Sequence, residues 1–262
     1  MRALYTAATG MMAQELNVEV ISNNIANMRT TGFKKQRAEF QDLIYQNLRR
    51  VGTNSSDQGT RLPAGVDIGG GVKVVGTPRI MSQGNLAASE RDLDVAIRGE
   101  GFFRIQLPDG RIAYTRAGSF ERDDQGRIVT PEGYLLDPQM TIPANATGVT
   151  INQQGQVSVT LPNQTNPTEI GQIQLARFVN RSGLQPVGDN LYLETASSGT
   201  PQLNNPGTDG TGTLLHKQLE TANVNAVTEI SDLIAAQRAY SMNAKVVSAA
   251  DEMLQATANM LR

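Results

Sequence analysis

Apolar residues recur at helical spacing at both ends of this chain. Over residues 2–28, apolar positions alternate at steps of three and four, and polar side chains occupy the opposite face. This spacing predicts an amphipathic helix, because residues three and four apart lie on one side of a helix. The predicted apolar face carries, in chain order, Leu4, Met11, Val18, Ile21 and Ile25.

A longer stripe occupies the C-terminal end. Large apolar residues recur at every seventh position over four heptads: Leu233, Tyr240, Val247, Leu254 and Leu261. A strict seven-residue repeat predicts a helix that packs against another helix. Two such stripes at opposite ends of one chain need each other, or need helices of neighbouring molecules, to be covered. The pattern therefore indicates a subunit of an assembly.

Turn signals separate short runs of apolar residues between positions 71 and 195. Asp109 and Gly110 form a strong two-residue hairpin signal between predicted strands at 102–107 and 112–116. Further turns are predicted at 123–126 and 153–155. Successive hairpins favour a mostly antiparallel sheet. The predicted fold class is α+β, with long N- and C-terminal helices packed as a coiled-coil-like layer and a central, mostly antiparallel β region.

Two stretches connect the ends to the middle. Residues 33–48 carry apolar side chains at helical spacing and predict a short second helix, and residues 50–65 are polar and read as a long loop. We therefore divide the chain into three parts. Residues 1–30 with 224–262 are predicted to form a helical polymerisation core, and 71–195 a β-rich outer domain. Residues 31–70 with 196–223 form a connecting region, which includes a loop at 46–65.

Composition excludes several classes of protein. The chain of 262 residues has no cysteine, so disulfides, thiol nucleophiles and cysteine-ligated metals are excluded. Its net charge of −2 gives no footprint for nucleic acid. No apolar run is long enough for membrane insertion. Thr6, Thr9 and Gly10 interrupt the N-terminal apolar residues, so we expect no cleaved signal peptide.

Candidate catalytic and metal-binding groups are weak. His216 is the only histidine and lacks a nucleophile motif, so an ordinary exposed or interface histidine is expected. Glu90, Asp92 and Asp94 alternate and could serve glycan hydrolysis, but a solvated strand face explains them better. Residues 123–126 lack the later ligands of a calcium loop and read as a hairpin turn. We therefore expect no catalytic residues, no metal and no cofactor.

A small basic cluster comprises Lys34, Lys35 and Arg37. Glu39 and Asp42 follow at helical spacing, so a solvated or salt-bridged face is the preferred interpretation. Nucleic-acid binding is the weaker alternative.

Asparagines cluster at the end of the first predicted helix, at Asn23, Asn24 and Asn27. Asparagine is a poor helix former because its amide competes with the backbone. Buried amides beside an apolar seam can set the register between helices at some cost in stability. The alternative is a fraying helix end that uses asparagine as a cap.

These asparagines and several other motifs resemble the flagellar rod and hook proteins of bacteria. The resemblance covers nearly the whole chain and is carried by residues 23–27, 31–34, 82–86, 94–103, 114–120, 188–192, 220–225, 237–240 and 251–254. One departure is His216-Lys217-Gln218, where the family more often has Gln-Gly and an aromatic residue. The chain length and the polar 45–63 segment are most similar to those of the distal rod. A proximal rod or hook subunit is the first alternative. A secreted enzyme that acts on cell-wall glycan is a second, more remote alternative.

The resemblance implies a non-enzymatic subunit that polymerises into a rigid, hollow helical driveshaft between motor and hook. It implies export by the flagellar export apparatus and a place in the basal body, from the periplasm to the outer membrane. Implied partners are further copies of the chain, the proximal rod proteins, the hook protein and the P- and L-ring proteins. The terminal helices would form the inner layer. A stiffening loop is implied at Asn54, Ser55, Ser56, Asp57, Gln58 and Gly59.

Overall fold

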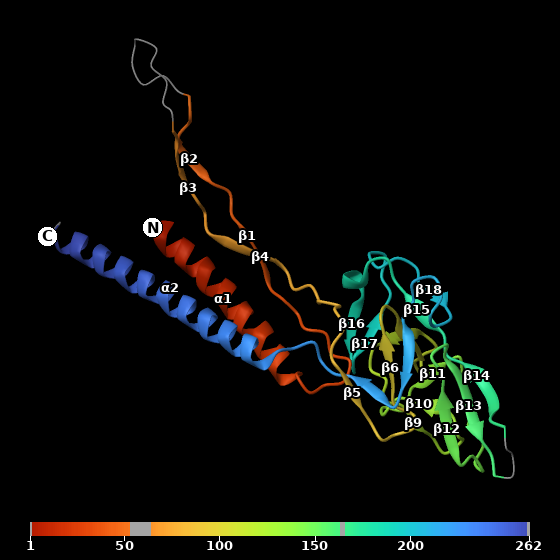
Figure 1. Cartoon of the computed structure of the whole chain (residues 1–262). Helices are drawn as coiled ribbons and strands as arrows, with labels where there is room; N and C mark the ends of the chain where they lie inside the picture. The colour runs from red at the N-terminus through yellow and green to blue at the C-terminus, as the bar shows by residue number, and fades with distance from the viewer. Residues whose placement is uncertain (1, 53–63, 163–165, 261–262) are drawn as a thin grey trace. The chain divides into compact units, whose positions relative to one another are not determined.

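The computed structural model describes residues 2–52, 64–162 and 166–260 of the chain (Figure 1). These residues form two compact units. The helical unit comprises Met1–Ile25, Gln36–Pro78 and Ala226–Arg262, and the β unit comprises Ala26–Lys35 and Arg79–Asn225. Most of the predicted connecting stretch 31–70 thus belongs to the helical unit, whereas 196–223 belongs to the β unit.

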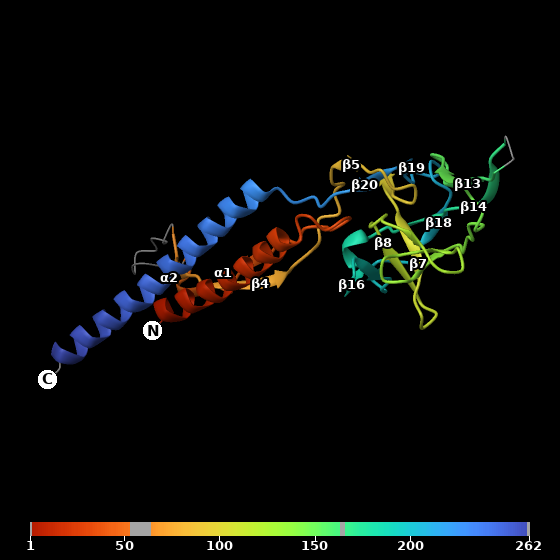
Figure 2. The same cartoon turned by 90° about the horizontal axis from the view of Figure 1, so that it is seen from below.

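Both predicted terminal helices are present. Helix α1 spans Arg2–Ala26 and helix α2 spans Ala226–Met260. They lie side by side and run antiparallel, with both chain ends at the same end of the pair (Figures 1 and 2). Asn24 contacts Glu229, and Gly10 lies against Asn243, so the two contacts are two heptads apart on each helix. This equal spacing gives the pair one consistent register.

The helix predicted over residues 33–48 is wrong. This stretch instead contains strands β1 (Glu39–Asp42) and β2 (Gln46–Arg49), which pair with β4 (Val72–Gly76) and β3 (Val66–Ile68) in two-stranded antiparallel ribbons. Pairing with a distant segment overrides the local helical spacing, as is common for strands. The ribbon reaches α1 at Gly71, whose positive φ of 116° and closeness to the Thr9 hydroxyl leave no room for a side chain.

The main sheet of the β unit is antiparallel throughout its described strands. Its order is β16–β17–β8–β7–β11–β10–β9, and β15 pairs with both β7 and β18. The strands are β7 (Phe102–Gln106), β8 (Ile112–Thr115), β9 (Glu121–Arg122), β10 (Ile128–Val129), β11 (Leu135–Asp137), β15 (Leu175–Arg177), β16 (Gln185–Gly188), β17 (Leu191–Leu193) and β18 (Gln202–Asn204). A short 3₁₀ helix, η1 (Arg181–Gly183), precedes β16.

Smaller sheets surround the main one. Strands β12 (Gly148–Ile151), β13 (Gln156–Thr160) and β14 (Thr168–Gln172) form an antiparallel meander. Strand β6 (Val95–Arg98) pairs with β19 (Thr213–His216), and β5 (Leu86–Ala88) pairs with β20 (Gln218–Glu220). The latter two pairs bring the residues before α2 back to the start of the β unit.

Strand β7 separates two apolar clusters, because its side chains alternate between the faces of the sheet. Phe103 and Ile105 enter the larger core, whereas Phe102 packs edge-on against Phe178 on the other face. The predicted hairpin turns at 109–110, 123–126 and 153–155 are confirmed, each with a glycine at positive φ. The structure thereby confirms the α+β class.

Candidate assembly surface and buried ion cluster

The predicted stripe on α1 is only partly covered. Gly10 and Asn24 mark the positions that face α2, so small and polar side chains make the closest contacts between the helices. The large apolar residues one position further along the chain keep part of their surface open: Leu4, Met11, Val18 and Ile25. Ile21 is buried. In the single chain, most of this stripe therefore flanks the contact between the helices.

Helix α2 shows the same division. Its buried residues are Glu229, Ala236 and Ala250, which are spaced by heptads or multiples of them. The predicted stripe lies four positions further on: Leu233 and Val247 are partly exposed, Tyr240 is 44% exposed and Leu254 is 38% exposed. Leu261 lies outside the described residues. Exposed apolar side chains along a helix are typical of a surface that binds a partner.

Among the three asparagines, Asn24 is the buried one. Its Nδ2 donates to the Gln36 carbonyl at 2.8 Å and to the Glu229 carboxylate at 3.1 Å, and its Oδ1 accepts the Gln36 N–H at 2.9 Å. Asn27 accepts a hydrogen bond from the Thr30 hydroxyl in the turn after α1. Asn23 lies at an exposed position. Of these three asparagines, the one at the contact between the helices is Asn24.

The ribbon adds a further apolar surface to the helical unit. Ile44 and Tyr45 are largely exposed, and with Tyr5 and Ile68 they border a hollow of about 570 Å³. The predicted stiffening loop, Asn54, Ser55, Ser56, Asp57, Gln58 and Gly59, lies outside the described residues. Its two flanks are β2 and β3, so the chain before and after it is paired.

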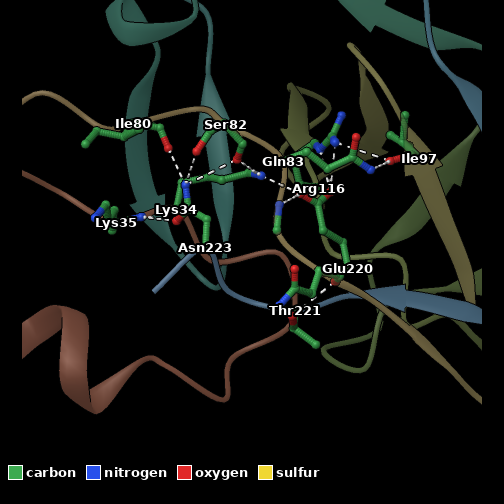
Figure 3. Close-up of polar contacts among 12 residues, drawn as sticks. Lys34, Lys35, Ile80, Ser82, Gln83, Ile97, Arg116, Glu220, Thr221 and Asn223 are labelled. Carbon is green, nitrogen blue, oxygen red and sulfur yellow. Dashed lines mark hydrogen bonds and ion pairs between the residues drawn. The ribbon is translucent and has the colours of Figure 1, made fainter. Parts of the chain in front are cut away.

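The β unit contains a buried ion cluster that sequence reasoning missed (Figure 3). The Glu220 side chain is fully buried and accepts hydrogen bonds from Lys34 Nζ, from Gly84 N–H at 2.8 Å and from Arg116 Nε at 2.9 Å. Arg116 also donates to the carbonyls of Gly99 and Gly101, at 2.9 and 2.7 Å. One carboxylate thus binds two buried cations.

Burial changes the titration of both cations. Desolvation lowers the pKa of Lys34 from its ordinary value, and the adjacent Glu220 carboxylate opposes this shift. Desolvation likewise lowers the pKa of the Arg116 guanidinium, again against the attraction of Glu220. The cluster therefore depends on its one shared carboxylate to keep both charges inside the protein.

These contacts correct two predictions. Lys34 is not on a solvated face but is buried with Glu220; Arg37 and Glu39 do form an exposed ion pair, at 2.8 Å. Asp94 does not share a solvated face with Glu90, because it is buried and accepts a hydrogen bond from the Ser89 hydroxyl. No local pattern signals the burial of Lys34, because its partner Glu220 lies 186 residues further along the chain.

The remaining candidates show no catalytic or metal-binding arrangement in the part of the chain that is described. His216 lies in β19, and its Nε2 is 2.7 Å from the Asp92 carbonyl oxygen. Asp123 accepts hydrogen bonds from the Gln125 and Arg127 backbones, which closes the predicted turn. Within the described residues, no cluster of three or more His, Asp or Glu side chains could hold a metal ion, and neither helix combines the length and apolar character of a membrane span.

Comparison with known proteins assigns the family. Three family models match: "Flagella basal body rod protein" over residues 4–34, "Flagellar hook protein FlgE/F/G D1 domain" over 96–159 and "Flagellar basal body rod FlgEFG protein C-terminal" over 217–260. The flagellar basal-body rod protein FlgG of Caulobacter vibrioides is 57% identical over 260 residues, covering 99% of each chain. The chain belongs to the flagellar basal-body rod protein family.

More distant relatives carry the same name. The flagellar basal-body rod protein FlgG of Borreliella burgdorferi is 45% identical over 264 residues, covering 100% of this chain and 99% of the relative. That of Bacillus subtilis is 36% identical over 267 residues, covering 100% of both. Each of the three segments matched by the rod-family models also contributes one charged residue to the buried cluster: Lys34, Arg116 and Glu220.

The departure from the family pattern at His216-Lys217-Gln218 falls at a tight bend between β19 and β20. Lys217 has a positive φ of 55°, its N–H donates to the Asp94 carbonyl at 2.8 Å and its carbonyl accepts the Ser89 N–H at 2.8 Å. Glycine, the residue that the resemblance leads us to expect here, adopts such a conformation without strain. The fold accommodates lysine in its place.

Proposed function

We propose that the chain is a structural, non-enzymatic subunit of the flagellar distal rod. It polymerises into a rigid, hollow helical shaft that transmits torque from motor to hook. The observation that carries this proposal is the apolar stripe that α1 and α2 leave open beside their own contact, in a chain of the basal-body rod family. Removing such a surface from water is favourable, so it drives association.

The exposed apolar stripe of α1 and that of α2 are two different surfaces of the same chain. This decides which kind of assembly they can form. A contact between two different surfaces of the same protein does not close on itself unless the rotation between copies closes a ring. When the rotation does not close, the copies form a helical filament. The stripe of α1 and the stripe of α2 are two such surfaces, and their pairing between neighbouring copies builds the inner layer of the shaft.

The partners follow from this placement. Copies of the chain bind along the shaft, the proximal rod proteins bind at one end and the hook protein at the other, and the β unit faces outward towards the P- and L-ring proteins. The chain reaches this position through the flagellar export apparatus. The 54–59 segment stiffens the shaft by bridging neighbouring subunits.

Polymerisation of the purified chain tests the proposal. At high concentration the unchanged chain forms straight tubes, and both of its termini become protected from proteolysis. Leu254→Asp places a charge on the stripe, so it abolishes tube formation and motility while the β unit remains folded. Asn259→Asp adds the same charge on α2 outside the stripe and serves as the matched control. Motile cells carrying Leu254→Asp would overturn the proposal, and curved, bendable tubes would favour a hook subunit instead.

A further inference from the structure

Three segments of the β unit lie next to points where the chain crosses to or from the helical unit. Residues 26–35 lie between two crossings, residues 79–85 follow the third and residues 220–225 precede the fourth. We propose that Lys34, Arg116, Glu220 and Asn223 form a clasp that binds these three segments to one another and to the core of the β unit. The clasp fixes the chain beside three of the four crossings, those at 35–36, 78–79 and 225–226.

Glu220 is the centre of the clasp, because it lies in the third segment and contacts the other two. Its carboxylate binds Lys34 in the first segment and the Gly84 N–H in the second, and its backbone carbonyl accepts the Gly32 N–H at 2.8 Å. Gly84 must be glycine for this approach, since a Cβ there would lie 1.9 Å from the Thr221 carbonyl oxygen. The absence of a side chain at Gly84 therefore allows the backbones of the second and third segments to lie close together.

Arg116 attaches the clasp to the sheet. It directly follows β8, and its guanidinium donates to carbonyls on both sides of the turn between β6 and β7, at Ile97, Gly99 and Gly101. Its bonds to Glu220, with Nη2–Oε2 at 2.8 Å, then join this turn to the segment before α2. The clasp thus rests on the folded core and forms only when β6, β7 and β8 are in place.

Asn223 provides a second, uncharged fastening. Its Oδ1 accepts the Lys35 N–H at 2.8 Å, and its Nδ2 donates to the Ile80 carbonyl at 2.8 Å and to the Ser82 hydroxyl at 3.0 Å. The Ile80 N–H returns to the Lys35 carbonyl at 2.8 Å. One side chain from the third segment therefore joins the other two (Figure 3).

Because one carboxylate binds two cations, we expect mutations of the clasp to differ in their effect on stability. Glu220→Gln keeps the shape but leaves two cations buried without their carboxylate, which is strongly destabilising. Adding Lys34→Met to Glu220→Gln removes one of these two uncompensated cations. The second change should therefore partly rescue the first, so that the double variant has a higher melting temperature than Glu220→Gln alone.

Hydrogen exchange on the full-length chain tests the clasp, whether or not the chain polymerises. Glu220→Gln should speed amide exchange by about tenfold or more in 30–35, 79–85 and 220–225 together, while β12–β14 stay protected. Glu121→Gln, which removes the carboxylate of an exposed ion pair with Arg91, is the control and should leave all three segments unchanged. Faster exchange confined to 220–225, or a double variant no more stable than Glu220→Gln, overturns the proposal.

An uncharged variant keeps the test decisive if Glu220→Gln does not fold. Asn223→Ala should speed exchange in both 30–35 and 79–85, because its amide joins them. Unchanged exchange in those two segments overturns the clasp.

Discussion

The side-chain amide of Asn24 donates a hydrogen bond to the carboxylate of Glu229, with 3.1 Å between Nδ2 and Oε2. Asn24 lies near the end of α1 and Glu229 in the first turn of α2, and both are buried. The same amide also bonds both backbone groups of Gln36, three residues before β1. One asparagine therefore joins three parts of the helical unit, and we propose that it sets the helix register.

Replacing this asparagine should weaken the helical unit. Asn24→Ala removes the hydrogen bonds that this amide makes with the partly buried Gln36 backbone and with the buried Glu229 carboxylate, which costs about 1–3 kcal/mol of unfolding free energy. Urea titration of the full-length chain, followed by helical circular dichroism, measures this loss. Ser22→Ala, at an exposed position on the same helix, is the control and should change stability by less than about 0.5 kcal/mol. Equal stability of the two variants would show that Asn24 does not hold the helices in register.

Local patterns predicted the elements whose determinants lie close together in sequence. The terminal helices follow from apolar spacing, and the hairpin at 109–110 follows from Asp109 and Gly110, which occupy the turn itself. The ribbon containing β1 could not be predicted this way, because its partner β4 lies beyond a long polar stretch. Lys34 and Glu220 are 186 residues apart, so no local pattern could bring them together.

The assembly stripe illustrates a different limit. Heptad spacing identified Leu233, Tyr240, Val247 and Leu254 as one face of α2, but spacing cannot tell which neighbour covers a face. Within the chain, Ala236 and Ala250 are buried, because small side chains allow close helix contact. The burial of each side chain, and not its heptad spacing, shows which positions of α2 are covered within the chain and which remain available to another copy.

Deleting residues 54–59 should soften the shaft. These residues lie outside the described part of the chain, and the expectation rests on the family resemblance of this polar segment. Electron micrographs of rods carrying the deletion should show increased curvature. Replacing the segment with alternating Gly and Ser of equal length separates the effect of sequence from that of length. Straight rods of unchanged stiffness after the deletion would contradict the stiffening role.

Gly118 should not tolerate a side chain. A Cβ at this position would lie 1.6 Å from the Val95 carbonyl oxygen, which belongs to backbone and cannot rotate away. Gly118→Ala should therefore cost more than about 3 kcal/mol and lower the melting temperature of the β unit markedly. Gly148→Ala is the matched control, because a Cβ there meets no atom within 4 Å. Similar melting temperatures for the two variants would refute this packing argument.

Lys217→Gly should stabilise the chain. A left-handed conformation at a residue other than glycine costs about 1–2 kcal/mol, and glycine removes that strain. The substitution also removes the exposed ion pair with Asp92, worth about 0–1 kcal/mol. Lys217→Ala removes the same ion pair but keeps the Cβ, so it isolates the backbone effect. Thermal unfolding should place the glycine variant above the alanine variant by about 1 kcal/mol, and the reverse order would contradict the assignment of strain.

Tyr114 should make the β unit sensitive to alkaline pH. Burial first, and the neighbouring Glu194 carboxylate second, raise the pKa of Tyr114 from 10.0 to about 12. The folded state therefore holds this proton over a range in which the unfolded chain has lost it. Its contribution to stability is fully present below pH 10.0 and is lost as the pH rises towards about 12.

Tyr114→Phe removes this titration, so the free energy of unfolding should fall less steeply across that window. At neutral pH the variant should stay within about 1 kcal/mol of the unchanged chain, because the hydroxyl makes only a long hydrogen bond, 3.4 Å, to Glu194. Denaturant unfolding at a series of pH values measures both quantities, and an unchanged alkaline slope would show that the buried phenol is not responsible.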